Sequence, residues 1–205
     1  MARNLGAMHL RAPAILIAAR PHGETAIIAR LLTEESGVVA AYVAGGRGRQ
    51  LRPVVIPGNL VEADIRAKSD SQLPFARLEL AQSRGPWLTE PLPASAIAWT
   101  CALTASALPE RNSYPSLYNA LSALLDAICS APSARGWAGA LASYEVLLLR
   151  ELGYGGAKPE IAGLEQALEI LRANEGQIAR YLLADTRADV LAARTLLMQR
   201  LERMA

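Results

Sequence analysis

The first third of the chain consists of short apolar runs separated by turn residues, a pattern typical of β-strands. Residues 14–20 form an apolar run that ends at Pro21-His22-Gly23, and residues 38–44 form another after Glu35-Ser36-Gly37. Between them, residues 24–33 fit either a helix or a strand by periodicity alone. The closeness of the next turn favours a strand, so three strands are expected in this region.

Two further segments alternate apolar and charged residues without interruption. Residues 61–68 read Val-Glu-Ala-Asp-Ile-Arg-Ala-Lys, and residues 75–80 repeat the pattern. Strict alternation puts one face of a strand in a core and the other face in water. Five strands spaced by about ten residues, with no crossover helix between them, predict a small closed barrel.

Almost everything after residue 93 has helical periodicity. Pro86, Pro91 and Pro93 mark a boundary, and beyond it apolar residues recur at steps of three and four. Helices are expected over residues 94–108, 115–129, 136–152, 163–183 and 186–204. The Asn-Glu-Gly segment at residues 174–176 is expected to kink the fourth helix, and Thr186 resembles a capping residue for the fifth.

These patterns predict an α+β protein in two parts, a β-barrel domain over residues 1–86 and an all-α helical bundle domain over residues 87–205. Residues 1–11 are expected to be disordered, because residues 1–7 show no pattern, and Met8 is expected to be the true start. Arg11 and Pro13 interrupt the early apolar region, so no secretory signal is expected. The apolar helix at residues 94–108 is too short to cross a bilayer, so no membrane association is expected.

Charge is spread unevenly over the two parts. Residues 1–86 carry eleven basic and seven acidic side chains, whereas residues 87–205 carry ten basic and twelve acidic ones. A basic front half fits a surface for a polyanion. Cys101 and Cys129 fall in apolar helical patterns, typical of buried, reduced thiols in a cytoplasmic protein. Two cysteines and two histidines without ligand spacing predict no metal site, and no cofactor is expected.

The segment Gly45-Gly46-Arg47-Gly48-Arg49-Gln50-Leu51-Arg52 places three arginines in a glycine-rich loop directly after a strand. Guanidinium groups match phosphate oxygens in a bidentate geometry, so this loop is a candidate for binding a phosphate backbone. An ordinary solvated hairpin loop is the alternative. The segment lacks the lysine and hydroxyl pair of a P-loop, and Glu24 has no partner placed by a motif, so no enzyme is predicted.

Several motifs, in this order and spacing, resemble the RecO family of bacterial recombination-repair mediators over most of residues 12–156. They are Arg20-Pro21-His22-Gly23-Glu24-Thr25, the Thr33–Val39 segment, Ala44-Gly45-Gly46-Arg47, Ile56-Pro57-Gly58-Asn59 and the Tyr144–Gly155 segment. Many members carry cysteines after the Leu-Gly-Tyr sequence, some of which bind zinc, whereas Lys158-Pro159-Glu160 follow here. The resemblance therefore implies a shortened, metal-free member.

The resemblance implies an N-terminal OB-fold that binds single- and double-stranded DNA and anneals complementary strands in the RecF pathway. It also implies single-strand-binding protein and RecR as partners, and indirect work with RecA, in the cytoplasm. Carried over to this chain, the DNA-binding residues are Arg20, Arg47, Arg49, Arg52, Arg66 and Lys68. The alternatives are a protein adaptor with weak DNA affinity and an RNA-binding β-barrel factor.

Two further expectations concern apolar and aromatic residues. Tyr42 and Phe75 are the two aromatic rings that the barrel offers for stacking on bases, and either fits the core equally well. A groove between helices is expected to accept the acidic, aromatic-ended tail of single-strand-binding protein, paired with Arg150 or Arg135.

Overall fold

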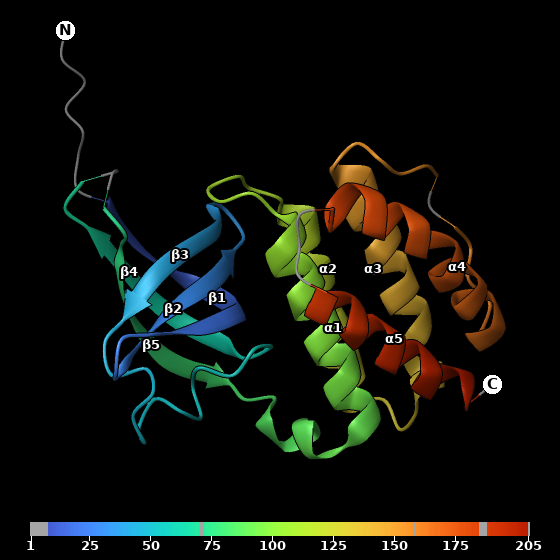
Figure 1. Ribbon diagram of the computed structural model, residues 1–205, viewed down its shortest axis with the longest axis horizontal. Helices are drawn as coiled ribbons and strands as arrows, with labels where there is room; N and C mark the ends of the chain where they lie inside the picture. Colours follow the sequence, from blue (N-terminus) through green and yellow to red (C-terminus); the bar gives the residue numbers. More distant parts are fainter. Residues whose placement is uncertain (1–7, 70–71, 158, 185–187, 205) are drawn as a thin grey trace, which may run out of the picture. The chain divides into compact units, whose positions relative to one another are not determined.

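The computed structural model describes residues 8–69, 72–157, 159–184 and 188–204 and divides into two compact units (Figure 1). The first unit extends to Pro86 and also takes in Pro109–Ser113. The second unit comprises Trp87–Leu108 and the chain from Tyr114 onwards. The chain thus passes through the first unit twice.

The described residues of the first unit form five strands that close into a barrel in the order β1-β2-β3-β5-β4. The strands are β1 (Met8–His22), β2 (Ala26–Thr33), β3 (Gly37–Val43), β4 (Leu60–Ala67) and β5 (Phe75–Gln82). The first half of the long β1 pairs with β4 and its second half with β2, so this strand connects the two sides of the barrel. This is the arrangement of an OB-fold, and the expected barrel is confirmed.

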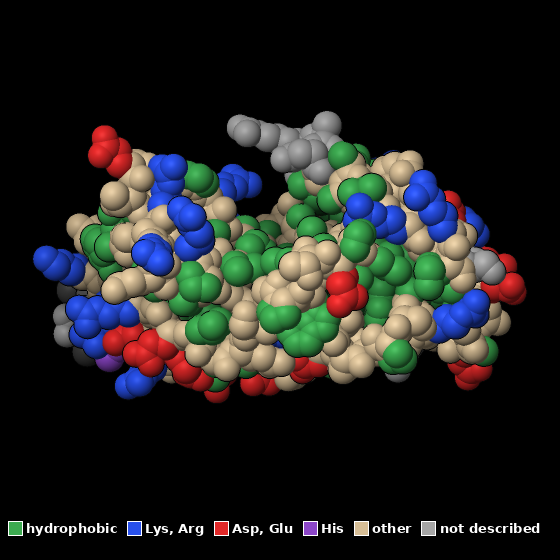
Figure 2. All heavy atoms as spheres, turned by 90° about the horizontal axis from the view of Figure 1, so that it is seen from below, with side chains coloured by type: hydrophobic (Ala, Val, Ile, Leu, Met, Phe, Trp, Pro, Cys, Tyr) green, Lys and Arg blue, Asp and Glu red, His purple; other side chains and the backbone are tan. Residues whose placement is uncertain are grey.

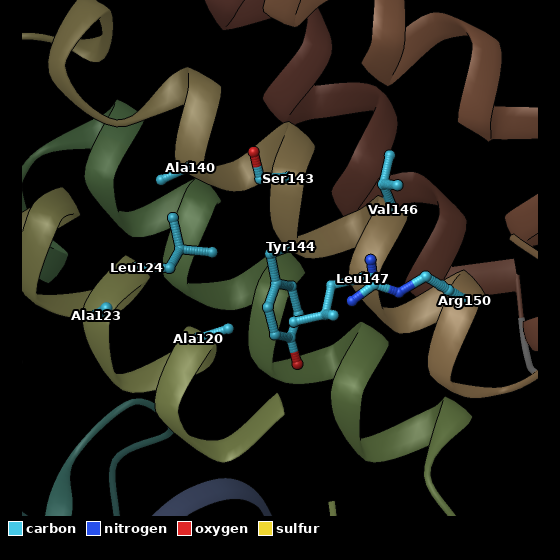
Figure 3. Close-up of a pocket in the computed structure, with 9 residues that line it drawn as sticks. All are labelled: Ala120, Ala123, Leu124, Ala140, Ser143, Tyr144, Val146, Leu147 and Arg150. Atoms are coloured by element: carbon cyan, nitrogen blue, oxygen red, sulfur yellow. The ribbon is translucent and has the colours of Figure 1, made fainter. Parts of the chain in front are cut away.

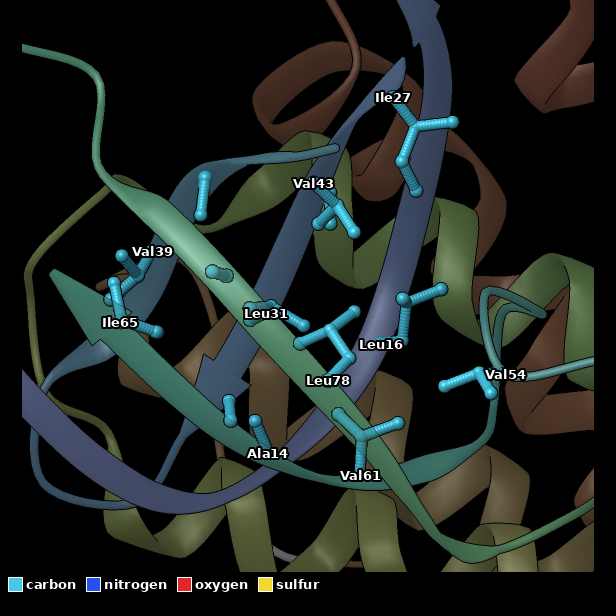
Figure 4. Close-up of a cluster of buried hydrophobic side chains, with 14 residues drawn as sticks. Ala14, Leu16, Ile27, Leu31, Val39, Val43, Val54, Val61, Ile65 and Leu78 are labelled. Carbon is cyan, nitrogen blue, oxygen red and sulfur yellow. The ribbon is translucent and has the colours of Figure 1, made fainter. Parts of the chain in front are cut away.

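The inward side chains of all five strands form one apolar core (Figure 4). Leu16, Leu31, Val39, Ile65 and Leu78 supply one inward residue from each strand, and each is buried. On β4 the buried residues alternate with exposed or partly exposed ones, as the alternation of residues 61–68 predicts. The barrel therefore has an apolar interior, and its chemistry lies on the outer surface and in the loops.

The expected disorder of residues 1–11 is wrong for residues 8–11, which belong to β1 and pair with β4; residues 1–7 lie outside the described part of the chain. Pro13 suggested a break in the sequence. In the structure Pro13 pairs with β4, and the pairing of β1 with β2 starts only at Ala14. A strand position with a neighbour on one side tolerates a residue that has no N–H to donate.

The segment Pro109–Ser113, here called the strap, packs on the turn between β2 and β3. The Arg111 N–H donates to the Val38 carbonyl at 2.8 Å, and Ser113 Oγ donates to the Glu34 carbonyl at 2.9 Å. Arg30 donates to Glu110 Oε1 at 2.7 Å. The strap therefore extends the barrel with residues that follow the first long helix in sequence.

The second unit is helical, as expected. Its helices are α1 (Pro91–Ala107), α2 (Pro115–Ser130), α3 (Ala138–Glu151), α4 (Leu164–Gln177) and α5 (Ala188–Glu202), with a short 3-10 helix at Ala134–Gly136. Another 3-10 helix, Gly85–Thr89, spans the boundary between the units. Helix α1 packs against α2 and α5, and α3 packs against α2 and α4. Among the described residues, no helix combines the length and apolar character needed to cross a membrane.

Two expected helix boundaries are wrong and one cannot be compared. Helix α1 begins at Pro91, before the expected residue 94, because proline is well suited to the first helical turn. The fourth helix changes to a π-helical turn over Ile178–Leu182, beyond the expected kink at residues 174–176. Thr186, the expected cap of α5, lies outside the described residues.

A buried carboxylate lies where four helices of the second unit meet. Glu145 on α3 is 1% exposed and accepts hydrogen bonds from Trp99 Nε1 of α1 at 2.9 Å and from Asn174 Nδ2 of α4 at 3.3 Å. Arg194 on α5 donates to the same carboxylate at 3.4 Å and to the carbonyl of Leu171. Burial raises the pKa of Glu145, and the charge of Arg194 opposes this rise.

Candidate nucleic-acid interface

Outward side chains that lie directly opposite one another on neighbouring strands form a continuous row around the barrel. From β1 through β2, β3 and β5 to β4, this surface row consists of Arg20, Ile28, Tyr42, Phe75 and Arg66. Directly opposed residues in a β-ladder share one face of the sheet. Two of the predicted DNA-binding residues, Arg20 and Arg66, therefore lie on one row with both aromatic residues between them.

The aromatic residues of the surface row are in contact with each other outside the core. Phe75 is 63% exposed, and its ring centroid lies 5.2 Å from that of Tyr42 at an interplanar angle of 66°. His22, at the end of β1, packs edge-on against Tyr42 at 5.9 Å. Exposed rings on an OB-fold are suited to stacking on nucleobases. The structure thus decides the question that the sequence left open, because Tyr42 and Phe75 are not core residues.

Arg47 fastens the arginine-rich loop to the turn between β1 and β2. Its N–H donates to the Thr25 carbonyl at 2.9 Å, and its guanidinium donates to the carbonyls of Gly23 and Glu24 at 3.2 and 3.0 Å. Gly45 begins the loop with a φ of +67°, a conformation that favours glycine. Arg47 therefore positions the loop beside the turn that follows His22.

Arg49 and Arg52 in the same loop are exposed, as is Lys68 just beyond β4. Within the described part of the chain, the side chains of these three residues make no hydrogen bond or ion pair. Arg49 and Arg52 are accordingly the loop arginines whose donors are available to a phosphate group.

The buried side chain of Asn59 holds the other end of this loop. In the sequence, Asn59 was identified only as part of the Ile56–Asn59 motif and not as a site residue. Asn59 is fully buried, and its Nδ2 donates to the carbonyls of Pro53 and Val54, each at 3.0 Å. Its Oδ1 accepts from the Arg84 N–H at 2.8 Å, and the guanidinium of Arg84 donates to the Gly58 carbonyl at 3.0 Å. The arginine-rich loop is therefore anchored at both ends.

A carboxylate interrupts the basic surface next to the row. Asp64 accepts from Arg66 Nε and NH2 at 2.9 and 2.8 Å, and His9 Nε2 lies 3.1 Å from Asp64 Oδ1. Arg11 of β1 and Arg77 of β5 are its ladder partners. The hydrogen bonds and charge of Arg66, helped by His9, lower the pKa of Asp64 to about 2, so Asp64 is ionised at neutral pH.

Sequence reasoning missed Arg11 and Arg77. Arg77 could have been found, because it lies on the polar face of the alternating segment 75–80. Arg11 could not, because residues 1–11 were expected to be disordered. Several separate Lys and Arg side chains lie on the visible face of the barrel unit, among apolar side chains and beside a group of acidic ones (Figure 2, left).

The helical unit contains a pocket of about 320 Å³ between α2 and α3 (Figure 3). Its lining consists of Ala120, Ala123, Leu124, Ala140, Ser143, Tyr144, Val146, Leu147 and Arg150. Small side chains on both helices leave this space open, and Arg150 contributes a cation on its α3 side. Arg135 instead donates to the Met204 carbonyl at 3.3 Å. Of the two arginines expected beside an apolar groove, Arg150 is the one in this α2–α3 pocket.

Comparisons with known proteins agree with these observations. The family model described as recombination protein O N terminal matches residues 8–84, and that described as recombination protein O C terminal matches residues 90–156. A protein of Rhodospirillum centenum named DNA repair protein RecO is 43% identical over 143 residues, which are 69% of this chain and 56% of that protein. One of Rhodospirillum rubrum with the same name is 40% identical over 69% of this chain and 57% of that protein.

A similarly named protein of Jannaschia sp. is 33% identical over 187 residues, which cover 90% of this chain and 75% of that protein. The chain spans less than two thirds of the length of the two Rhodospirillum relatives. Both family models and a relative matched over three quarters of its length nevertheless agree on one assignment: this chain belongs to the RecO family.

Proposed function

We propose that the chain is a non-enzymatic DNA repair and recombination mediator. Its barrel binds single- and double-stranded DNA and anneals complementary strands, and the chain helps to load the RecA recombinase onto DNA coated with single-strand-binding protein. The observation that supports this proposal best is the surface row, in which Arg20 and Arg66 lie on either side of the half-buried ring of Tyr42 and the exposed ring of Phe75.

The surface row suits a single strand that crosses the barrel. Four steps between neighbouring strands, of about 4.8 Å each, separate Arg20 from Arg66 by about 19 Å along the curved surface. Arginines on both sides neutralise phosphates, and rings between them stack on base faces. Neither contact uses the hydrogen-bonding edges of the bases, which stay available for pairing with a complementary strand.

Removal of the Phe75 ring tests the stacking part of this proposal. Phe75→Ala is expected to weaken binding of an oligothymidylate by about tenfold and to leave the salt dependence unchanged, because a base–ring contact releases no counterions. The matched control is Leu80→Ala, which removes another exposed apolar side chain from the same strand. Fluorescence anisotropy over a salt series measures both quantities, and equal effects of the two substitutions would contradict base stacking on Phe75.

Removal of arginines from the arginine-rich loop should, unlike Phe75→Ala, change the salt dependence of DNA binding. A variant with Arg49→Ala and Arg52→Ala is expected to flatten the plot of log affinity against log salt concentration by about 1.4, because two phosphate contacts are lost. Arg47 is left in place, since it holds the loop through backbone carbonyls. An unchanged slope would show that this loop does not contact the DNA backbone.

Annealing of complementary labelled oligonucleotides coated with single-strand-binding protein tests the mediator function itself. The wild-type chain should accelerate annealing, and the loop variant should not. A folded wild-type chain that does not accelerate annealing but binds a protein partner would favour the adaptor alternative. A preference for RNA over DNA of the same sequence and length would favour the RNA-binding alternative.

We infer that the α2–α3 pocket receives the acidic, aromatic-ended tail of single-strand-binding protein, with Arg150 pairing an acidic group of the tail. The lining is apolar apart from Ser143, the Tyr144 hydroxyl and Arg150, so the pocket offers contact area for an aromatic ring. The nearest ion pair of Arg150 is a long one, 3.9 Å from Glu151 Oε1. RecR is a further proposed partner.

Arg150→Ala is expected to weaken binding of a synthetic tail peptide by about fivefold, because a charge-assisted contact is lost from a partly exposed site. Arg135→Ala is the matched control, since it removes an exposed arginine of the same unit outside the pocket. Isothermal titration calorimetry with the peptide distinguishes the two variants. Equal weakening by both substitutions would show general charge attraction without a role for the pocket.

A further inference from the structure

Basic side chains occupy most of the positions next to Asp64 on the barrel. Its ladder partners on both sides are arginines, Arg11 on β1 and Arg77 on β5. Arg66 lies two residues further along the same face of β4 and is bound to Asp64 through two hydrogen bonds. His9, on the other side, adds a ring nitrogen at 3.1 Å. Asp64 is thus an acid in contact with Arg66 and His9, with two further arginines at the ladder positions on either side of it.

The contact between Asp64 and Arg66 has the geometry in which arginine binds phosphate. The two carboxylate oxygens accept from Nε and NH2 of one guanidinium at 2.9 and 2.8 Å, as two phosphate oxygens do in a bidentate contact. The pair lies beside Phe75, which is the ladder partner of Arg66. A phosphate next to a base stacked on Phe75 would therefore meet a guanidinium whose Nε and NH2 edge Asp64 already occupies.

We propose that Asp64 limits the affinity of the barrel for DNA, because its carboxylate holds the bidentate anion position on Arg66, between the ladder partners Arg11 and Arg77, that a backbone phosphate would otherwise take. This inference rests on the DNA binding proposed above and adds a residue that sets its strength. A phosphate must displace the carboxylate before it can take the bidentate Nε and NH2 edge of Arg66, so the strand is held weakly at this point and is readily released.

Weak binding at this position has a use in annealing. Two strands that have paired must leave the surface, and a strand held by every available arginine would leave slowly. Asp64 competes for the guanidinium throughout and so favours release. Its effect is local, because the next outward positions of the ladder are the acidic pair Glu62 and Glu79, and neither is bound to Arg66.

The test is the isosteric variant Asp64→Asn, compared with Glu62→Gln, which removes one negative charge from the same face of β4 and leaves the bidentate contact between Asp64 and Arg66 intact. Asp64→Asn is expected to bind an oligothymidylate about five- to tenfold more tightly than the wild type at low salt. The salt slope should become steeper by about 0.7, because one further phosphate contact forms. Glu62→Gln should change the affinity less than twofold. A double variant that combines Asp64→Asn with Arg66→Gln should not show the tighter DNA binding of Asp64→Asn.

Each outcome bears on a separate claim. A wild-type chain that binds no DNA at low salt would contradict the proposed function. If the wild type binds DNA and Asp64→Asn binds no more tightly than Glu62→Gln, the role of Asp64 as a competitor is wrong. Weaker binding by Asp64→Asn would show that Asp64 positions Arg66 for DNA, which also contradicts the inference. Asp64→Ser provides a second neutral variant, and thermal unfolding checks that both remain folded.

Discussion

Replacement of Arg194 by methionine is expected to destabilise the helical unit by about 3–5 kcal/mol, the range for breaking a buried ion pair on one side. Methionine keeps the apolar volume of the side chain and removes its charge. Glu145 would then remain buried, with Trp99 and Asn174 as its hydrogen-bond donors. The carbonyl of Leu171 would lose its donor from Arg194 as well. Urea unfolding monitored by circular dichroism measures the change.

The effect of this substitution should depend on pH with a defined sign. A carboxyl whose pKa is raised by folding destabilises the folded state progressively as pH rises above its ordinary value of about 4.3. Burial already raises the pKa of Glu145, and loss of Arg194 raises it further. Arg194→Met should therefore be closest to the wild type near pH 4 and furthest from it near pH 7.

A surface pair provides the control for this experiment. Arg172 donates to Glu202 Oε1 at 2.8 Å, but both side chains are about half exposed. Arg172→Met should cost less than about 1 kcal/mol and show little dependence on pH, as exposed ion pairs do. Equal losses in the two variants, or a loss for Arg194→Met that does not change with pH, would show that the buried carboxylate is not destabilised in this way.

Gly37→Ala is expected to destabilise the barrel unit by about 3 kcal/mol, from a strained backbone together with a steric overlap. The φ of Gly37 is +66°, and a Cβ atom at this position would lie 1.9 Å from the carbonyl oxygen of Asn112 in the strap. A backbone atom at that distance must move, so the strap would be displaced from Val38. Chemical unfolding measures the loss, and amide exchange at Arg111 reports on the strap.

The matched control is Gly45→Ala, because Gly45 has a φ of +67° and a Cβ atom there would have no neighbour within 4 Å. It should cost about 1 kcal/mol, the strain of a left-handed backbone alone. The difference between the two variants isolates the contact with the strap. If both substitutions cost the same, the strap contributes nothing to the stability of the barrel.

The sequence predicted the parts of the fold that depend on local periodicity. The alternation of residues 61–68 identified β4 because each residue of a strand has a defined side. The beginning of β1 was missed, because a proline normally indicates a break in a strand. Pro13 is tolerated because β1 pairs only with β4 at this position, and its pairing with β2 starts at Ala14. The start of α1 was misplaced because prolines were interpreted as the boundary before the helix. In the structure Pro91 is the first residue of α1.

The candidate site depends on which residues pair between strands, and the periodicity of the sequence does not predict this pairing. Tyr42 and Phe75 are neighbours only through the single pairing of β3 with β5 that closes the barrel. Arg20 and Arg66 were proposed individually, and only the ladder places them on one row. In the same way, no local pattern joins Glu145 to Arg194, whose contact needs the packing of separate helices.

The strap has a consequence for how this protein can be divided and recombined. A fragment that ends at Pro86 would lack the residues that pair with Val38 and Arg30, although it would contain every strand of the barrel. A gene fusion at that point would leave the barrel either without a strap or with the strap of another protein. The smallest cassette that carries the intact first unit therefore runs through Ser113 and includes α1. Exchange of DNA-binding modules between members of the family should accordingly favour crossover points after the strap.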